Sequence, residues 1–176
     1  MNSMMRLIVL GTVLTMPVAF GGCGPGRPRA DAMPIEVVLA KDVIDAGRSV
    51  QVDLVGVGAG EQSKFASKAV REWFRGGDAD RAAATQNGTA RTVNFVPGGA
   101  TSQSVGEKDA FWTSALSRQA ATLYVFAFVA GEDASGKDVA WRKELPLDPS
   151  RYEGERIRLE VQRGGVNVLN LKPEKK

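Results

Sequence analysis

The sequence has no histidine and only one cysteine among its 176 residues. Without histidine, the commonest general base and a frequent transition-metal ligand are absent. A single cysteine cannot form an intramolecular disulfide or a cysteine-based zinc cluster. Catalysis by Ser/Lys, Ser/Asp or paired carboxylates stays formally open, but no motif favours it. We therefore predict that the protein is not an enzyme and that it holds no metal.

The sequence also lacks a strong excess of charge. The formal net charge of the full chain is +3. Residues 1–22 carry Arg6 and no acidic residue, so the rest of the chain has 22 basic and 20 acidic side chains. This small surplus does not indicate a nucleic acid or another polyanion as a partner. The apolar fraction of 43% and the charged fraction of 24% are ordinary for a soluble globular protein. The chain should therefore fold as one domain around a core.

The N-terminus has the pattern of an export signal. Arg6 precedes an apolar, uncharged stretch over residues 7–20, which is typical of a secretory signal peptide and short for a membrane span. The small residues Gly21 and Gly22 then lead into the sole cysteine, Cys23. This arrangement is similar to the lipobox of bacterial lipoproteins, in which the cysteine becomes lipidated, although Phe20 stands where leucine is usual. A plain secretory signal or an uncleaved anchor are the alternatives.

The expected lipid determines where the protein resides. Each buried CH₂ of an acyl chain contributes about 0.8 kcal/mol, so two or three chains on Cys23 anchor a protein in the bilayer almost permanently. By resemblance to enteric lipoproteins, Gly24 in place of aspartate favours the outer membrane, with the protein facing the periplasm. Residues 23–34 are expected to form the lipidated cysteine and a flexible tether rich in proline and glycine. We expect no cofactor besides this covalent lipid.

Residues 35–172 are predicted to form the folded domain, followed by a basic tail over 173–176. Apolar alternation and β-branched runs predict about seven strands. They cover residues 35–40, 49–57, 91–96, 122–130, 139–147, 156–162 and 166–171. The run over 122–130 is apolar on both faces, which indicates a central strand that is covered on both sides. The pattern predicts a mainly β fold, a two-sheet antiparallel β-sandwich.

An amphipathic helix is predicted over residues 63–74, inserted after the second strand and covering an edge or end of the sandwich. Its apolar residues recur at helical spacing. They are Phe65, Ala69, Val70, Trp73 and Phe74. Residues 78–90 are expected to form a loop that could include a helical turn, and residues 101–106 a plain loop. A second short helix is expected over 107–116.

Several short motifs follow the lipobox in a characteristic order. They are Ser-Val-Gln-Val-Asp-Leu-Val over 49–55, the helical segment with Phe65 and Trp73-Phe74, Val96-Pro97-Gly98-Gly99, the apolar strand over 123–128, Trp141-Arg142 and a closing hairpin. This order resembles the TssJ family, the outer-membrane lipoproteins of type VI secretion systems. The resemblance covers most of residues 35–171 and implies a small β-sandwich with a helical insertion.

The resemblance also implies a partner. Members of that family bind the periplasmic domain of a large inner-membrane secretion protein through the loop that joins their first two strands. In this sequence that loop is short and consists of Lys41, Asp42, Val43, Ile44, Asp45, Ala46, Gly47 and Arg48. The resemblance therefore implies a docking subunit of a secretion complex in the cell envelope, with these residues as its partner-binding loop.

A different function stays open beside this one. The protein could be a lipoprotein whose β-sandwich binds a small apolar ligand or an envelope component. In that case the large aromatic side chains could line an apolar cleft under the predicted helix. These side chains are Trp73, Phe74, Phe111 and Trp112. If they are buried against the sheet instead, the idea loses its basis.

The lipid anchor leads to a direct prediction. Cys23→Ser removes the only thiol that can be acylated, so the protein should leave the membrane pellet and appear, still folded, in the soluble fraction. Fractionation of cells that express the wild-type protein and the variant measures this. If Cys23→Ser stays in the membrane pellet, the lipoprotein interpretation is falsified and the apolar stretch over 7–20 acts as an anchor instead.

Overall fold

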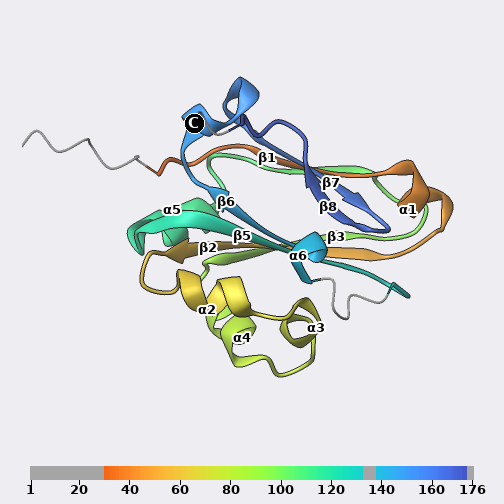
Figure 1. Cartoon of the computed structure of the whole chain (residues 1–176), viewed down its shortest axis with the longest axis horizontal. Helices are drawn as coiled ribbons and strands as arrows, with labels where there is room; N and C mark the ends of the chain where they lie inside the picture. The colour runs from red at the N-terminus through yellow and green to blue at the C-terminus, as the bar shows by residue number, and fades with distance from the viewer. Residues whose placement is uncertain (1–29, 133–137, 174–176) are drawn as a thin grey trace, which may run out of the picture.

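The computed structural model describes residues 30–132 and 138–173, which form two four-stranded sheets stacked as a β-sandwich (Figure 1). The strand order is β4-β1-β7-β8 in one sheet and β3-β2-β5-β6 in the other. The strands are β1 (Ile35–Leu39), β2 (Val50–Gly58), β3 (Ala90–Phe95), β4 (Ser102–Val105), β5 (Ala120–Val129), β6 (Arg142–Pro146), β7 (Ile157–Gln162) and β8 (Gly165–Val168). Only the β1–β7 pair among these is parallel. The β-sandwich predicted from the sequence is confirmed.

Short helices connect the strands. They are α1 (Lys41–Asp45), α2 (Gln62–Ser67), α3 (Val70–Trp73), α4 (Ala79–Gln86), α5 (Ala110–Ser117) and α6 (Asp138–Trp141), with two 3-10 turns, η1 (Pro149–Arg151) and η2 (Glu153–Glu155). Within the described ranges, no helix is both long enough and apolar enough to cross a membrane. The predicted signal peptide over 1–22 and Cys23 lie outside the described residues.

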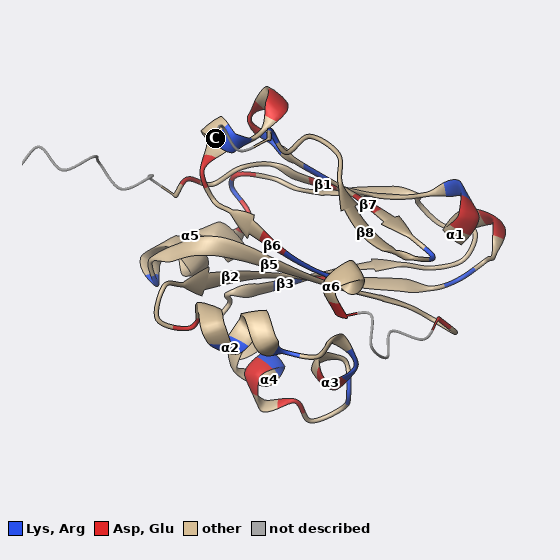
Figure 2. Ribbon diagram, in the orientation of Figure 1, with Lys and Arg blue, Asp and Glu red and all other residues tan. Residues whose placement is uncertain are grey.

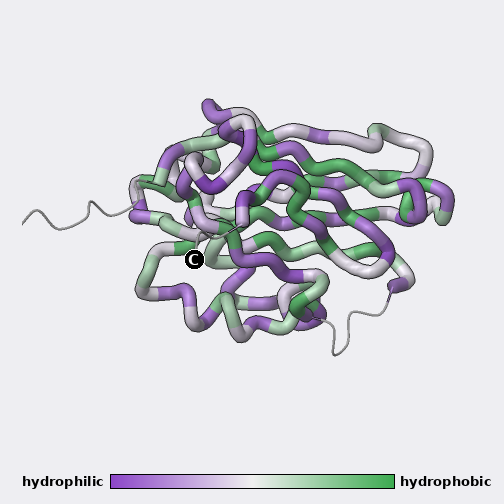
Figure 3. Tube along the Cα trace, turned by 45° about the horizontal axis from the view of Figure 1, so that its top comes forward, coloured by the Kyte–Doolittle hydropathy of each residue, from purple (hydrophilic) through white to green (hydrophobic). Residues whose placement is uncertain are grey.

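Strand β5 is the centre of the molecule. Its residues alternate between the two sides of the sheet, so Leu123 and Val125 face the other sheet while Tyr124 and Phe126 face the opposite way. All four side chains are buried. The most hydrophobic stretches of the chain follow the strands in the interior, and hydrophilic stretches gather at the turns (Figure 3). The sequence-based expectation that this strand is covered on both sides is confirmed.

The second cover of β5 is the helical insertion, which we define as α2, α3 and α4. It lies on the outer face of the β3-β2-β5-β6 sheet, away from the other sheet (Figure 1), rather than at an edge or end as the sequence suggested. Trp73 of α3 stacks on Phe126, with ring centroids 4.4 Å apart. Phe65 of α2 contacts Tyr124 at 5.7 Å. Stacked and tilted ring pairs at these distances are favourable beyond their burial.

The insertion differs in detail from the single helix predicted over 63–74. The backbone is extended at Lys68 and Ala69, with ψ of 125° and 134°, so α2 and α3 are separate. The amide of Val70 donates to the carboxylate of Asp138 at 2.6 Å, a partner that is distant in the sequence. A long-range hydrogen bond thus replaces one that a continuous helix would have made locally.

Helix α4 occupies residues that the sequence analysis assigned mainly to a loop. The Asp78 side chain caps it by accepting a hydrogen bond from the amide of Arg81 at 2.8 Å. A capping aspartate followed by alanines is a favourable helix start, because aspartate satisfies an unpaired amide and alanine has the highest helix propensity. The short helix predicted over 107–116 is present as α5, which packs so closely on β2 that a Cβ at Gly56 would lie 2.5 Å from Ala115 Cβ.

Two further elements differ from the expectation. Residues 102–105, predicted as loop, form β4, because they pair with β1 along the sheet edge. Val105 is the only large apolar residue of β4, so alternation could not reveal it. Residues 139–141, predicted to begin a strand, form most of α6, and the strand begins at Arg142.

The folded domain also begins earlier than the predicted boundary at Ile35. The Met33 side chain is buried in the core. The Asp31 amide donates to the Leu147 carbonyl at 3.2 Å, and the Pro34 carbonyl accepts from the Ile157 amide at 2.9 Å. Residues 31–34 therefore belong to the sandwich and not to the tether, although their composition gave no periodicity.

A buried carboxylate fastens the insertion to the sheet. Asp53 of β2 is 1% exposed. It accepts hydrogen bonds from Trp73 Nε1 at 2.9 Å, Arg81 Nε at 2.7 Å and Thr92 Oγ1 at 2.7 Å. One side chain thus links β2 with α3, α4 and β3. A buried charge is stable only when paired and hydrogen-bonded, as it is here.

Removing this carboxylate should destabilise the protein strongly. Asp53→Ala leaves the Trp73 ring nitrogen without its acceptor and Arg81 without its ion pair, so we expect the free energy of unfolding to fall by about 3 kcal/mol. Urea denaturation measures the change. As a matched control, Asp45→Ala removes an exposed carboxylate that pairs with Lys41 and should cost less than about 1 kcal/mol. Equal losses in the two variants would contradict a fastening role for Asp53.

Candidate docking surface

The predicted partner-binding loop over 41–48 is an ordered helical turn. It connects β1 to β2 and contains α1, at the end of the sandwich opposite to the start of the described chain (Figure 1). Val43 is fully buried and holds the turn against the core. Ile44, its neighbour, points outward and is 43% exposed. The turn therefore presents one large apolar side chain to solvent from a fixed backbone.

Hydrogen bonds to neighbouring strands keep this turn in place. The Ala40 amide donates to the Val161 carbonyl of β7 at 2.9 Å. The Asp42 carboxylate accepts from the Val43 amide at 2.8 Å and from the Arg163 amide at 3.0 Å. Because Asp42 bonds to the β7–β8 turn, the predicted loop and that turn form one continuous end of the sandwich.

The charges on this end have both signs (Figure 2). Lys41 and Asp45 form an exposed pair at 2.8 Å within α1. Arg163 pairs with Glu132 at 2.7 Å, and this hydrogen bond raises the pKa of Arg163. Exposed pairs of this kind contribute little to stability but can guide the approach of a partner. Among the described residues, no group of three or more potential metal ligands exists here or elsewhere.

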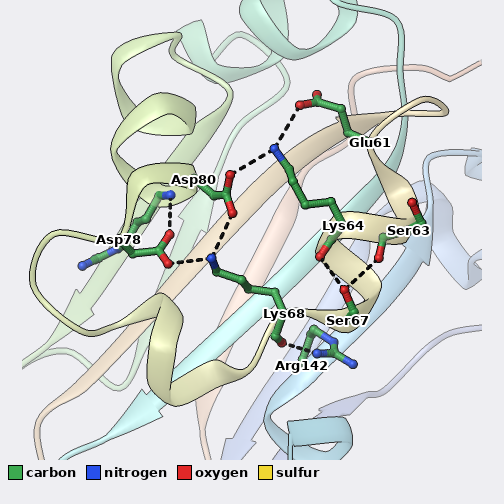
Figure 4. Close-up of polar contacts among 9 residues, drawn as sticks. Glu61, Ser63, Lys64, Ser67, Lys68, Asp78, Asp80 and Arg142 are labelled. Carbon is green, nitrogen blue, oxygen red and sulfur yellow. Dashed lines mark hydrogen bonds and ion pairs between the residues drawn. The ribbon is translucent and has the colours of Figure 1, made fainter.

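A second polar cluster lies on the insertion and has a structural role (Figure 4). Lys68 of the α2–α3 break contacts Asp78 at 2.6 Å and Asp80 at 2.9 Å. Lys64 of α2 contacts Asp80 at 3.1 Å and Glu61 at 3.4 Å. Every charge of this cluster thus has a partner of opposite sign. The Lys68 carbonyl also accepts a hydrogen bond from Arg142 of β6. The cluster joins α2 to α4 and leaves no unpaired base or nucleophile within it.

The pKa directions follow from these pairs. The hydrogen bond from Lys68, and then that from Lys64, lower the pKa of Asp80. The hydrogen bond to Asp78 raises the pKa of Lys68. The hydrogen bond to Asp80 raises the pKa of Lys64. Asp80 therefore contributes stability above its ordinary pKa, and this contribution is lost as the pH falls through its lowered pKa. The lysines contribute below their ordinary pKa and lose that contribution as the pH rises through their raised pKa.

The four aromatic side chains that the ligand hypothesis required do not line a common cleft. Trp73, Phe111 and Trp112 are buried in the core, and Phe74 is half-buried against Phe128. A groove of about 940 Å³ lies at the end of the sandwich where the described chain begins, opposite to α1. Its described lining consists of Ala30, residues 58–61, Leu116, residues 118–121, residues 146–148 and Arg151, and includes none of these rings. The hypothesis that the sandwich binds a small apolar ligand in a cleft of aromatic side chains therefore has no support from their positions.

The cluster on the insertion leads to a pH prediction. Asp80→Asn cannot ionise, so the variant should lose less stability than the wild type when the pH falls from about 5 to about 2. Urea unfolding at a series of pH values measures this slope. Asp45→Asn removes an exposed carboxylate that pairs with Lys41 and is the matched control, and Asp80→Asn should change the slope more than it does. An unchanged slope in Asp80→Asn would show that other carboxylates account for the acid sensitivity.

Comparison with known proteins identifies the fold. No family model and no curated protein matches the chain. A chain in the solved structure of the T6SS protein TssM C-terminal domain from EAEC aligns with a TM-score of 0.53 and 21% identity, covering 78% of this chain and 99% of that one. The T6SS lipoprotein TssJ1 from Pseudomonas aeruginosa aligns with a TM-score of 0.46 and 14% identity, covering 81% and 96%. Serratia marcescens Lip, a membrane-bound component of the type VI secretion system, aligns with 0.45 and 13%, covering 78% and 97%.

At these identities the likeness concerns the fold alone. Of the three alignments, the first has a TM-score above 0.5 and spans nearly the whole of the matching chain. The small β-sandwich with a helical insertion, which the resemblance to the TssJ family implied, is thereby confirmed as the fold. The chain has the β-sandwich fold of a solved chain from a type VI secretion system.

Proposed function

We propose that this protein is a lipid-anchored subunit of a type VI-like secretion complex and that it docks a partner protein in the periplasm. The single observation that supports this most is the fold likeness to a type VI secretion chain over 78% of the sequence. The partner would be the periplasmic domain of a large inner-membrane secretion protein of the TssM type. The anchor would be the lipid on Cys23, in the outer membrane.

The position of α1 suits such a role. The described chain begins at Ala30 at one end of the sandwich, and β1 runs from there to α1 at the other end (Figure 1). The seven residues that lead from Cys23 to Ala30 can span at most about 25 Å. A lipid on Cys23 would therefore keep the first end beside the membrane. The α1 end would point away from it, toward a partner that reaches across the periplasm.

The α1 turn also has the properties of a docking element. Its backbone is held by hydrogen bonds to β7 and to the β7–β8 turn, so little ordering is needed when a partner binds. Its exposed apolar side chain, Ile44, shares the turn with the charged pair of Lys41 and Asp45, and apolar side chains beside polar ones are common in protein interfaces. Recognition of a protein surface needs these features and no reactive group.

The proposal predicts a specific binding defect. Ile44→Asp places a charge in the centre of the surface, so affinity for the periplasmic domain of the organism's TssM-type protein should fall by about tenfold or more. Isothermal titration with the mature domain, residues 24–176, measures the dissociation constant. The thermal midpoint of the variant should stay near that of the wild type, because Ile44 is outside the core.

Leu169→Asp is the matched control, because Leu169 is 46% exposed, close to the 43% of Ile44, and its amide donates to the Arg158 carbonyl near the start of β7, away from the α1 end. It should bind within about twofold of the wild type. If the wild-type protein does not bind the periplasmic domain, and a pull-down from a detergent extract of the native cells recovers no other secretion subunit, the proposed function is wrong.

A further inference from the structure

A shallow groove lies beside α1 and is formed by two connections that are distant in the sequence. One wall comes from the β1–β2 connection and the other from the β3–β4 turn. The described lining residues are Leu39, Val43, Ile44, Gly47, Arg48 and residues 96–101. The sequence motif Val96-Pro97-Gly98-Gly99 thus lies next to the predicted partner-binding loop, although more than 40 residues separate them.

The β3–β4 turn holds Val96 in a fixed place. The Gly99 amide donates to the Val96 carbonyl at 3.0 Å, and Gly98 has a φ of +72°, as expected for a tight turn with proline before glycine. A Cβ at Gly99 would lie 3.0 Å from Val96 Cγ2, so the valine side chain packs directly over this glycine. The turn is tied to the other wall, because the Thr101 carbonyl accepts from the Leu39 amide at 2.9 Å.

The size of the groove indicates what it can hold. Its volume is about 100 Å³. Pockets for small molecules are usually about 300–1,000 Å³, whereas this volume equals that of about three water molecules in the liquid. It is the space of one side chain. The walls expose two apolar side chains, Ile44 and Val96, and Val96 is 65% exposed. An apolar side chain that enters would bury this surface, so its binding free energy would be the most favourable.

One cation at the groove, Arg48, has no partner of opposite sign within the described part of the chain. Arg48 is exposed and forms no ion pair with any residue that the structure describes, whereas Lys41 and Arg163 at the same end are both paired. Its guanidinium lies against the Gly131 backbone, with Nη1 2.7 Å from where a Cβ of that residue would be. A guanidinium offers a planar set of donors that matches a carboxylate. The charge that complements this groove is therefore negative.

We infer that the β3–β4 turn and Arg48 complete the docking surface of the proposed function, on which this inference rests. The occupant is a segment of the partner protein with an apolar side chain close to an aspartate or glutamate. The apolar side chain enters between Ile44 and Val96, and the carboxylate pairs with Arg48. Both walls are rigid before binding, so the partner meets a preformed site.

The test uses the mature domain and the periplasmic domain of the organism's TssM-type protein. Val96→Asp should weaken binding by about tenfold or more, because it places a charge where the apolar side chain enters. Arg48→Glu should weaken binding by a similar factor and should reduce the loss of affinity between low and high salt, because an ion pair is screened by salt. Isothermal titration at two salt concentrations measures both effects.

The controls separate this inference from the proposed function. Leu169→Asp and Lys108→Glu change exposed residues outside the groove, and both variants should bind within about twofold of the wild type. If Val96→Asp and Arg48→Glu bind like the wild type while Ile44→Asp does not, the surface ends at α1 and the inference is overturned, with the proposed function intact. If the wild type itself does not bind, the proposed function fails and this inference fails with it.

Discussion

The two apolar faces of β5 are the constraint on which the rest of the structure depends. One sheet face can be buried by a second sheet, and the β4-β1-β7-β8 sheet does this. The other face carries Tyr124 and Phe126 and needs a separate cover, which the helical insertion supplies through Phe65 and Trp73. The insertion is too short to be stable alone, because its helices have four to eight residues. Asp53 holds it on the sheet, and the paired lysines and aspartates join α2 to α4 within it.

The core contains most of the large aromatic side chains, and the proposed function uses the surface turns instead. The two ends of the sandwich differ in what they connect. One end carries the start of the described chain, and the other carries α1 with the β3–β4 and β7–β8 turns beside it (Figure 1). This separation is what a tethered docking subunit requires, because anchoring and recognition then use opposite ends. Recognition by preformed turns on a rigid sandwich also needs no catalytic group.

The sequence predicted those elements whose signal is local. The alternation over residues 49–57, the two-sided apolar run of β5 and the closing hairpin of β7 and β8 were all recognisable, because each strand carries its own hydrophobic period. The cap and alanine run of α4 were also present in the sequence but were outweighed by its polar composition. Asp53 alternates with apolar residues in β2, as an exposed polar residue would, so its burial was not recognisable. Its partners Trp73, Arg81 and Thr92 could not be identified without the fold.

The sequence by itself determined the class of the protein: a β-sandwich with a helical insertion, an order of motifs like that of a secretion lipoprotein, and a composition without histidine. Tertiary structure alone decided where the insertion breaks, that residues 102–105 become a strand, and that Val96 lies beside Ile44. The physical reason is the same in each case. Local periodicity records which face of an element is buried, but these features arise from hydrogen bonds and contacts between segments that are distant along the chain, such as Asp138 with Val70 and Thr101 with Leu39.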